Sequence, residues 1–324
     1  MDLKKIDIII PAYKPDRKFD LLIQQLLRQT YPIQKIIVIN TKSGPFPWET
    51  AGLDPKIFVK EITSREFDHG ATRRMAVEMS DAEIVVCMTQ DAVPKDTRLI
   101  ERLTAVFEDE SVGCAYARQL PDDQCDAIER YTRSFNYPAK SFLKDSSAVD
   151  EMGIKAYFCS NVCAAYRRNY YDKAGGFVKK AIFNEDMIMA ARMLKLGYKC
   201  AYVAEAEVIH SHNYTCIQQL KRNFDLAVSQ ADYPDVFQGV KSESEGIKLV
   251  SRTALYLIRI RKPWLVIRLV IKSAFKYLGF LLGKNYRKLP LKLVVRCSSN
   301  PKYWIDVSYC SHRAVHHAAR HRSQ

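Results

Sequence analysis

Carboxylate and imidazole side chains stand at the ends of several apolar runs in the sequence. Asp91 follows a run typical of a buried strand, Glu185 and Asp186 open a helical pattern, and His210 and His212 follow a short strand-like run. A carboxylate can accept a proton as a general base, and carboxylates together with imidazoles bind divalent cations. Singly, each residue could cap a turn or a helix or lie in an exposed loop. Together, at the ends of successive elements, they indicate one catalytic or ligand-binding site.

The first 120 residues alternate between strand and helix patterns. Strands are expected at 6–10, 35–40, 56–62, 82–89 and 111–120, with helices at 19–29, 71–80 and 96–107. This alternation predicts an α/β, Rossmann-like fold with a mostly parallel sheet and helices on both faces. Ligands of such sheets bind beyond the carboxyl ends of the strands, where the polar residues stand.

The pattern changes in the second half of the chain. Residues 121–160 lose the alternation, as expected for a loop or subdomain insertion on the acceptor side. A helix is predicted at 186–197, followed by two short strands at 198–203 and 206–209. Thr215 and Gln218 have capping-box spacing and predict the start of another helix.

The net charge of +14 comes from one C-terminal segment. Residues 246–305 hold 14 Lys and Arg and no Asp or Glu, whereas the rest of the chain has 36 basic and 36 acidic residues. Arg268, Lys272 and Lys276 form one stripe on an otherwise apolar helical pattern at 264–283, which favours a helix lying on an anionic membrane surface. Packing on the sheet domain or an oligomer contact is the alternative. Nucleic-acid binding is not expected, because stacking aromatics are not interleaved with the charges.

Composition indicates a cytoplasmic protein. Nine cysteines without a CxxC pair fit a reducing compartment, the first apolar run stops at Pro11 and is too short for a secretion signal, and no run approaches the ~20 apolar residues of a membrane span. The expected units are a main domain at 1–230, the basic helical segment at 246–305 and a disordered tail at 306–324.

Four blocks of sequence carry a family resemblance. "IIIPAYKP", "IIVIN", "FDHGATRRMAVEMSDAEIVVCMTQDAVP" and "NEDMIMAARMLKLGYKCAYVAEAEVIHSHNY" resemble the family 2 glycosyltransferases with the A-type fold. The likeness covers roughly residues 4–230 and is greatest to bacterial rhamnosyltransferases of cell-surface polysaccharide assembly.

The resemblance implies where the nucleotide of the donor binds. Pro11, Ala12 and Tyr13 correspond to the strand end that cradles the nucleotide. Asn40 stands where the family usually has an Asp, and its amide can still hydrogen-bond a uracil or thymine. Arg73 corresponds to a contact of the diphosphate or base, with an ordinary surface arginine as the alternative.

The resemblance also implies a metal site. Thr89, Gln90 and Asp91 occupy the family's Asp-x-Asp position, which holds Mg²⁺ or Mn²⁺ on the donor diphosphate. Only the carboxylate of Asp91 is present here, with Thr89 in place of the first Asp. His210 or His212 matches a late family histidine, and since alternate residues of an extended segment point opposite ways, we expect His212 alone in the site.

Asp186 corresponds to the catalytic base of an inverting transfer, in which one carboxylate takes the proton of the acceptor hydroxyl. Glu185 is expected to orient the acceptor or the loop, and the two roles could be exchanged. Asn161 and Trp48 are further candidate pocket residues.

The expected function is transfer of a sugar, L-rhamnose from dTDP-rhamnose, to a lipid-linked surface polysaccharide at the inner face of the cell membrane. The alternatives are a related enzyme that uses another UDP- or dTDP-sugar and a non-catalytic protein that binds a glycan or a partner. A nucleotidyltransferase would need a glycine-rich loop, and "PAYKPDRK" has no glycine.

Overall fold

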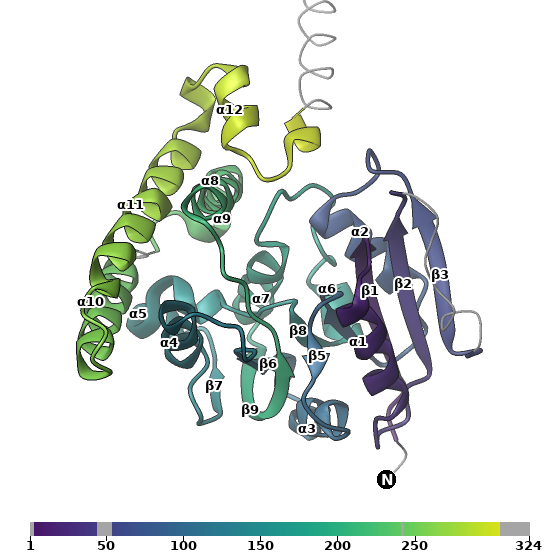
Figure 1. The fold of residues 1–324 in the computed structure, drawn as a ribbon. Coiled ribbons are helices and arrows are strands. Elements are labelled where there is room, and N and C mark those ends of the chain that lie inside the picture. The colour runs from purple at the N-terminus through teal and green to yellow at the C-terminus, as the bar shows by residue number, and fades with distance from the viewer. Residues whose placement is uncertain (1–2, 44–53, 241–242, 305–324) are drawn as a thin grey trace, which may run out of the picture.

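The computed structural model describes residues 3–43, 54–240 and 243–304. Within these ranges one nine-stranded sheet runs through the molecule, and helices cover both of its faces (Figure 1). The predicted tail at 306–324 and the candidate residue Trp48 lie outside the described residues.

The strands are β1 (Ile6–Tyr13), β2 (Lys35–Thr41), β3 (Ile57–Ile62), β4 (Ile84–Met88), β5 (Val93–Pro94), β6 (Val112–Leu120), β7 (Phe142–Lys144), β8 (Cys163–Arg167) and β9 (Lys199–Ile209). The helices are α1 (Arg17–Leu27), α2 (His69–Glu78), α3 (Leu99–Ala105), α4 (Ala127–Asn136), α5 (Ala148–Met152), α6 (Arg168–Lys173), α7 (Glu185–Lys195), α8 (Cys216–Asp232), α9 (Pro234–Phe237), α10 (Glu243–Arg259), α11 (Leu265–Lys284) and α12 (Leu291–Cys297).

The sheet separates two hydrophobic cores. Ile9 of β1 packs in one core with residues of α2 and α7, whereas Ile8 and Ile10 pack in the other with residues of α1 and α3. Successive side chains of a strand point to opposite faces, so a continuous apolar run such as 6–10 fits only a strand that is covered on both sides. The predicted α/β architecture is therefore confirmed.

The order of the strands is β3-β2-β1-β4-β8-β6-β9-β5, with β7 paired to β9. The part built from β3, β2, β1 and β4 is parallel, as predicted. The rest is mixed, because β8 runs antiparallel to both β4 and β6. The chain returns from the insertion at the edge where β4 ends, so Cys163 begins β8 opposite Met88. The two strands expected at 198–203 and 206–209 form the single strand β9.

The C-terminal helices pack on the rest of the molecule. Helix α11 lies along α8, and α10 lies against α4 (Figure 1). Arg268 and Lys272 form ion pairs with Asp126 at the start of α4, with N–O distances of 3.4 and 3.1 Å, and Lys272 is buried. Lys272 of the predicted cationic stripe therefore faces the protein, because α4 offers it a carboxylate, whereas the Arg268 side chain stays 54% exposed.

The opposite side of α11 is apolar and exposed, notably at Ile267, Val270 and Ile271. In the part of the chain that the structure describes, no helix is both long enough and apolar enough to cross a lipid bilayer.

Candidate active site

The carboxyl ends of β1, β2 and β4 meet at one edge of the sheet. Ala12 of β1 and Asn40 of β2 are register partners. The amide of Gln90 clamps the end of β1, since its Oε1 accepts from the Tyr13 backbone N–H at 2.6 Å and its Nε2 donates to the Tyr13 carbonyl at 3.1 Å. Among the described side chains, the buried Oδ1 of Asn40 has no hydrogen-bond partner. The predicted nucleotide residues Pro11, Ala12, Tyr13 and Asn40 are thus brought together.

Asp91 and both histidines of the HSH segment form one cluster. Asp91 Oδ2 lies 3.1 Å from His212 Nε2 and 3.5 Å from His210 Nε2, and the two Nε2 atoms are 3.1 Å apart. The prediction that only His212 enters the site is wrong. β9 ends at Ile209, so the alternation of strand side chains no longer applies to the two histidines.

Gln119, at the end of β6, fixes the orientation of His210. Its Oε1 lies 3.0 Å from His210 Nδ1, while its Nε2 donates to Ser160 Oγ at 3.1 Å, so Oε1 is the acceptor and Nδ1–H the donor. The lone pair of His210 then lies on Nε2, which faces Asp91. Burial lowers the pKa of His210 to about 3, so the imidazole is neutral near pH 7.

Burial alone would raise the pKa of Asp91. Its hydrogen bond with His212 and the charge that the two histidines can carry hold that pKa well below its ordinary value. Asp91 Oδ2 and the Nε2 atoms of His210 and His212 thus converge. A single N–H on His212 can donate a hydrogen bond to only one of the other two atoms. This is a donor set that can hold a metal ion.

Asp186 is fixed at the start of α7. Its Oδ2 accepts from the backbone N–H of Asn161 at 3.1 Å and its Oδ1 from that of Met187 at 2.7 Å. The turn before it places Asn184 in the left-handed region, at φ 62°, which Asn tolerates better than most residues. The strained backbone at Asn184 sets the direction in which Glu185 and Asp186, the next two residues, leave the turn.

Glu185 is buried in a different setting. Its Oε1 lies 3.0 Å from Arg73 Nη1 and accepts from Asn161 Nδ2 at 3.1 Å. Burial opposes ionisation of Glu185, but the charge of Arg73, the nearby His69 and the hydrogen bond from Asn161 together outweigh burial and lower the pKa of Glu185. Burial and the negative charge of Glu185 raise the pKa of Asp186 to about 7. Arg73 is itself 5% exposed and engaged with Glu185, so its predicted donor contact stays a prediction.

A series of contacts, part hydrogen bond and part backbone, runs between the surroundings of the two predicted carboxylates. Asp186 accepts from the backbone of Asn161, the adjacent Ser160 accepts from Gln119, and Gln119 holds the histidine that faces Asp91. The surroundings of Asp91 and Asp186 are therefore connected, and their position in one catalytic site stays a prediction. A proton acceptor and a cluster suited to a cation stand at the two ends of this connection.

Several residues of this site were not predicted. Gln119 also accepts from Arg133 of α4, and the guanidinium of Arg222 lies 5.1 Å from the ring centre of Tyr214, which in turn lies 5.0 Å from the His212 ring. Gln119 could have been found as a polar residue at a strand end. Arg133 and Arg222 stand within helices, and no local signal points to them.

The model of the family "Glycosyl transferase family 2" matches residues 7–175. The chain belongs to this family. This glycosyltransferase is 35% identical to the O-antigen chain rhamnosyltransferase RfbN of Salmonella typhimurium over 96% of its own length and 99% of the relative's. It is 33% identical to the O-antigen chain rhamnosyltransferase WbaN of Salmonella anatum, over 95% and 98%.

Solved structures show the same fold. A mannosyltransferase of Pyrobaculum calidifontis, solved with GDP-Man and Mn²⁺, superposes on the glycosyltransferase with a TM-score of 0.56 at 16% identity, covering 95% of this chain and 87% of that one. TarS of S. aureus, solved as residues 1–349 with UDP-GlcNAc, gives 0.51 at 12% identity, covering 88% and 92%. The predicted A-type fold and the prediction of an enzyme are confirmed.

Proposed function

We propose that this glycosyltransferase transfers L-rhamnose from dTDP-rhamnose, with inversion, to a lipid-linked cell-surface glycan. The observation that carries the proposal is that Asp186, whose pKa is raised to about 7, accepts from the backbone of Asn161, next to Ser160, which Gln119 bonds while also holding His210 beside Asp91. The names of the two relatives support the sugar and the class of acceptor.

Asp186 is the proposed base. It takes the proton of the acceptor hydroxyl while that oxygen bonds to the anomeric carbon and the bond from this carbon to the phosphate oxygen breaks, releasing dTDP. Two backbone N–H groups hold its carboxylate in place, and a pKa near 7 gives it both an ionised form and useful basicity at neutral pH. Glu185, paired with Arg73, stays ionised and positions this turn.

Asp91, His210 and His212 are the proposed ligands of a divalent cation. Between the two ions expected from the sequence, the cluster suits Mn²⁺ better than Mg²⁺, because Mg²⁺ prefers oxygen ligands alone. When bound, the ion would neutralise the charge of the departing diphosphate. Arg222, beside Tyr214, adds a positive charge on the same side of the site.

Membrane association is proposed from the outer surface of α10 and α11, which we call the apolar hairpin face. Its exposed apolar residues are Leu255, Ile258, Trp264, Ile267, Val270 and Ile271. Arg259, Arg261 and Lys262 are exposed where the two helices join, next to Trp264. Apolar groups with a tryptophan and adjacent cations are typical of segments that lie on an anionic bilayer, where a lipid-linked acceptor would be found.

Donor choice is the direct test of this proposal. Binding and nucleotide release are measured with dTDP-rhamnose, UDP-glucose, UDP-GlcNAc and GDP-mannose, with Mn²⁺ and a lipid extract of the source organism as acceptor. We expect release of dTDP from dTDP-rhamnose at least tenfold faster than release from the other donors, and loss of release in EDTA. Faster release from a UDP-sugar would favour the alternative donor.

A further inference from the structure

Three buried cysteines converge in the hydrophobic core to which α2 and α7 contribute. Cys114 lies in β6 and Cys200 in β9, and the two are register partners in the sheet. Cys159 stands shortly before β8. All three side chains are fully buried, and their Sγ atoms lie within 4.8 Å of one another. We call this group the cysteine triad.

The spacing of the three sulfurs suits a metal ion. Zn²⁺ binds cysteine thiolates at about 2.3 Å, and tetrahedral angles then place two sulfurs about 3.8 Å apart. The cysteine triad reaches this spacing with small movements of its side chains. Soft thiolates select Zn²⁺ or Cu(I) over the hard ions Mg²⁺ and Mn²⁺. The cysteine triad is therefore chemically distinct from the cluster at Asp91, which contains no sulfur.

A buried lysine lies beside the cysteine triad. Lys144 of β7 is the register partner of Cys200 on the side of β9 opposite β6, and it is 1% exposed. Its ammonium donates to the backbone carbonyls of Lys155 and Phe158 and stands 4.8 Å from the ring centre of Tyr116. Within the described ranges of the chain, no carboxylate forms an ion pair with it.

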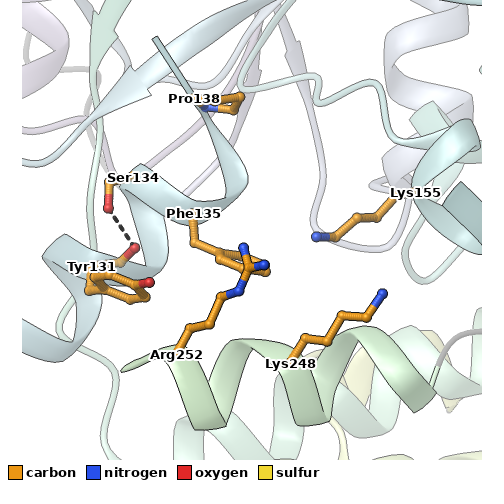
Figure 2. A pocket seen from close by; sticks show the side chains of 7 residues that line it. All are labelled: Tyr131, Ser134, Phe135, Pro138, Lys155, Lys248 and Arg252. Carbon is orange, nitrogen blue, oxygen red and sulfur yellow. Dashed lines mark hydrogen bonds between the residues drawn. The ribbon is translucent and has the colours of Figure 1, made fainter. Parts of the chain in front are cut away.

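The side chain of Lys155 does not share this environment. It lines a pocket of about 520 Å³ between α4 and α10, where its amine lies 4.3 Å from the ring centre of Phe135 (Figure 2). Only the backbone carbonyl of Lys155 reaches Lys144. Lys144 is therefore the cation that faces the cysteine triad.

A buried ammonium needs a compensating negative charge, because burial removes the water that stabilises it. The two carbonyls satisfy N–H groups of Lys144 but carry no net charge. Hydrogen bonds from Cys114 and Cys159, together with the charge of Lys144, lower the pKa of Cys200 well below its ordinary value. Three thiolates around Zn²⁺ leave one net negative charge, which the Lys144 ammonium balances. Three neutral thiols would leave that ammonium uncompensated.

We propose that Cys114, Cys159 and Cys200 bind one Zn²⁺ ion in the core of this glycosyltransferase, with Lys144 as the counter-charge. Each thiol releases its proton to solvent as its sulfur bonds to the ion. Zn²⁺ is normally four-coordinate in proteins, so a small ligand such as water completes its shell. The inference goes beyond the proposed function and depends on neither the donor nor the acceptor.

Zinc in the cysteine triad has a structural role. Cys159 Sγ lies 3.9 Å from Tyr166 Oη, which donates to Asn161 Oδ1 at 2.8 Å. The backbone N–H of Asn161 donates in turn to Asp186. An ion that joins β6, β9 and the segment at Cys159 adds its binding free energy to the stability of the fold and holds the turn that contacts Asp186.

Co²⁺ is the probe that tests this assignment, because Co²⁺ bonded to thiolate has a charge-transfer absorption that carboxylate and imidazole ligands do not give. The full chain, kept reduced, is titrated with Co²⁺ and followed until the absorbance is constant, since a buried site binds through local opening. We expect one equivalent of Co²⁺ to produce the band and Zn²⁺ to abolish it. Cys200→Ala and Cys114→Ala should each lower the band at least fivefold. Cys163→Ala, which removes a buried cysteine of β8 outside the cysteine triad, should leave it unchanged.

Zinc-dependent stability is the second measurement. A hundredfold excess of Zn²⁺ over its Kd should raise the melting temperature of Cys163→Ala by about 5 °C more than that of Cys200→Ala. Only the first of these variants keeps all three sulfurs of the cysteine triad. Both keep Asp91, His210 and His212, so Zn²⁺ bound to that cluster cancels in the comparison.

Absence of the charge-transfer band in the wild type would overturn the proposal and leave the three cysteines as ordinary apolar residues of the core. A band of full height in Cys200→Ala would also overturn it, because the thiolates would then lie elsewhere in the chain. Equal effects of Zn²⁺ on the melting temperatures of Cys163→Ala and Cys200→Ala would contradict the structural role.

Discussion

Glu185 and Asp186 are neighbours in the chain, yet their surroundings push their pKa values in opposite directions. Arg73 keeps Glu185 ionised, and that charge, added to burial, raises the pKa of Asp186 to about 7. Carboxylates whose pKa values are separated in this way take different roles. Asp186 can exchange a proton near neutral pH, whereas Glu185 cannot.

The raised pKa of Asp186 predicts a cost in stability at high pH. Its ordinary value is 3.8, so between about pH 4 and pH 7 the folded state holds a proton that the unfolded state has lost. Stability therefore falls as the pH rises through this window. We expect the free energy of unfolding of Asp186→Asn, relative to the wild type, to increase by about 1 kcal/mol between pH 6 and pH 8. Urea unfolding without metal or donor measures this difference, and a difference independent of pH would contradict it.

The charged residues at strand ends could be predicted from the sequence, but the side chains that they contact could not. Asp91 and Asp186 could be predicted because each follows a recognisable local pattern. The ion pair of Glu185 with Arg73, and the entry of both His210 and His212 into one cluster, depend on how α2, α7 and β9 meet. No spacing within the chain encodes those contacts.

At the scale of elements, two glycines allow α11 to lie directly on α8. A Cβ added at Gly279 would stand 2.2 Å from the carbonyl oxygen of Leu220, and one added at Gly283 would stand 2.3 Å from that of Phe224. The two backbones therefore meet without intervening side chains. This contact holds the cationic stripe of α11 against α4.

Gly279→Ala should force α11 away from α8. We expect a loss of about 2 kcal/mol in the free energy of unfolding, because overpacking against a backbone carbonyl cannot be relieved by a rotamer change. Gly246→Ala in α10 is the matched control, since nothing lies within 4 Å of its added Cβ, and it should leave the protein as stable or slightly more stable. Equal melting temperatures of the two variants in thermal denaturation would show that the close contact between α11 and α8 does not contribute to stability.

Most elements were predictable because their apolar periods are regular. The capping box at Thr215 and the end of α7 near Gly197, at φ 85°, lie close to the predicted positions. The direction of β8 and the inward face of α11 were not predictable. Each is decided by a distant partner, β4 in the first case and Asp126 in the second.

At the scale of the molecule, the apolar hairpin face remains uncovered in the described structure. Ile267 and Ile271 stand one turn apart on it, 69% and 46% exposed. On a membrane this face would be buried while the inward stripe keeps α11 docked on the catalytic unit.

Liposome flotation tests this arrangement. The full chain should float with phosphatidylglycerol vesicles at low salt, and Ile267→Glu/Ile271→Glu should reduce the floating fraction at least fivefold, because it places two like charges in the contact. Leu196→Glu, at an equally exposed apolar position outside α10 and α11, should float as the wild type does. Flotation of all three proteins, or of none, would contradict a membrane role for this face.

Turnover by Asp186→Asn, measured together with donor binding, tests the catalytic assignment most directly. With dTDP-rhamnose, Mn²⁺ and lipid-linked acceptor at pH 8, we expect release of dTDP to fall by a factor on the order of a thousand, because the acceptor hydroxyl loses its base. The Kd for dTDP-rhamnose should stay within about twofold of the wild type, since a general base contributes little to ground-state donor binding. Turnover within tenfold of the wild type would show that another group removes the proton.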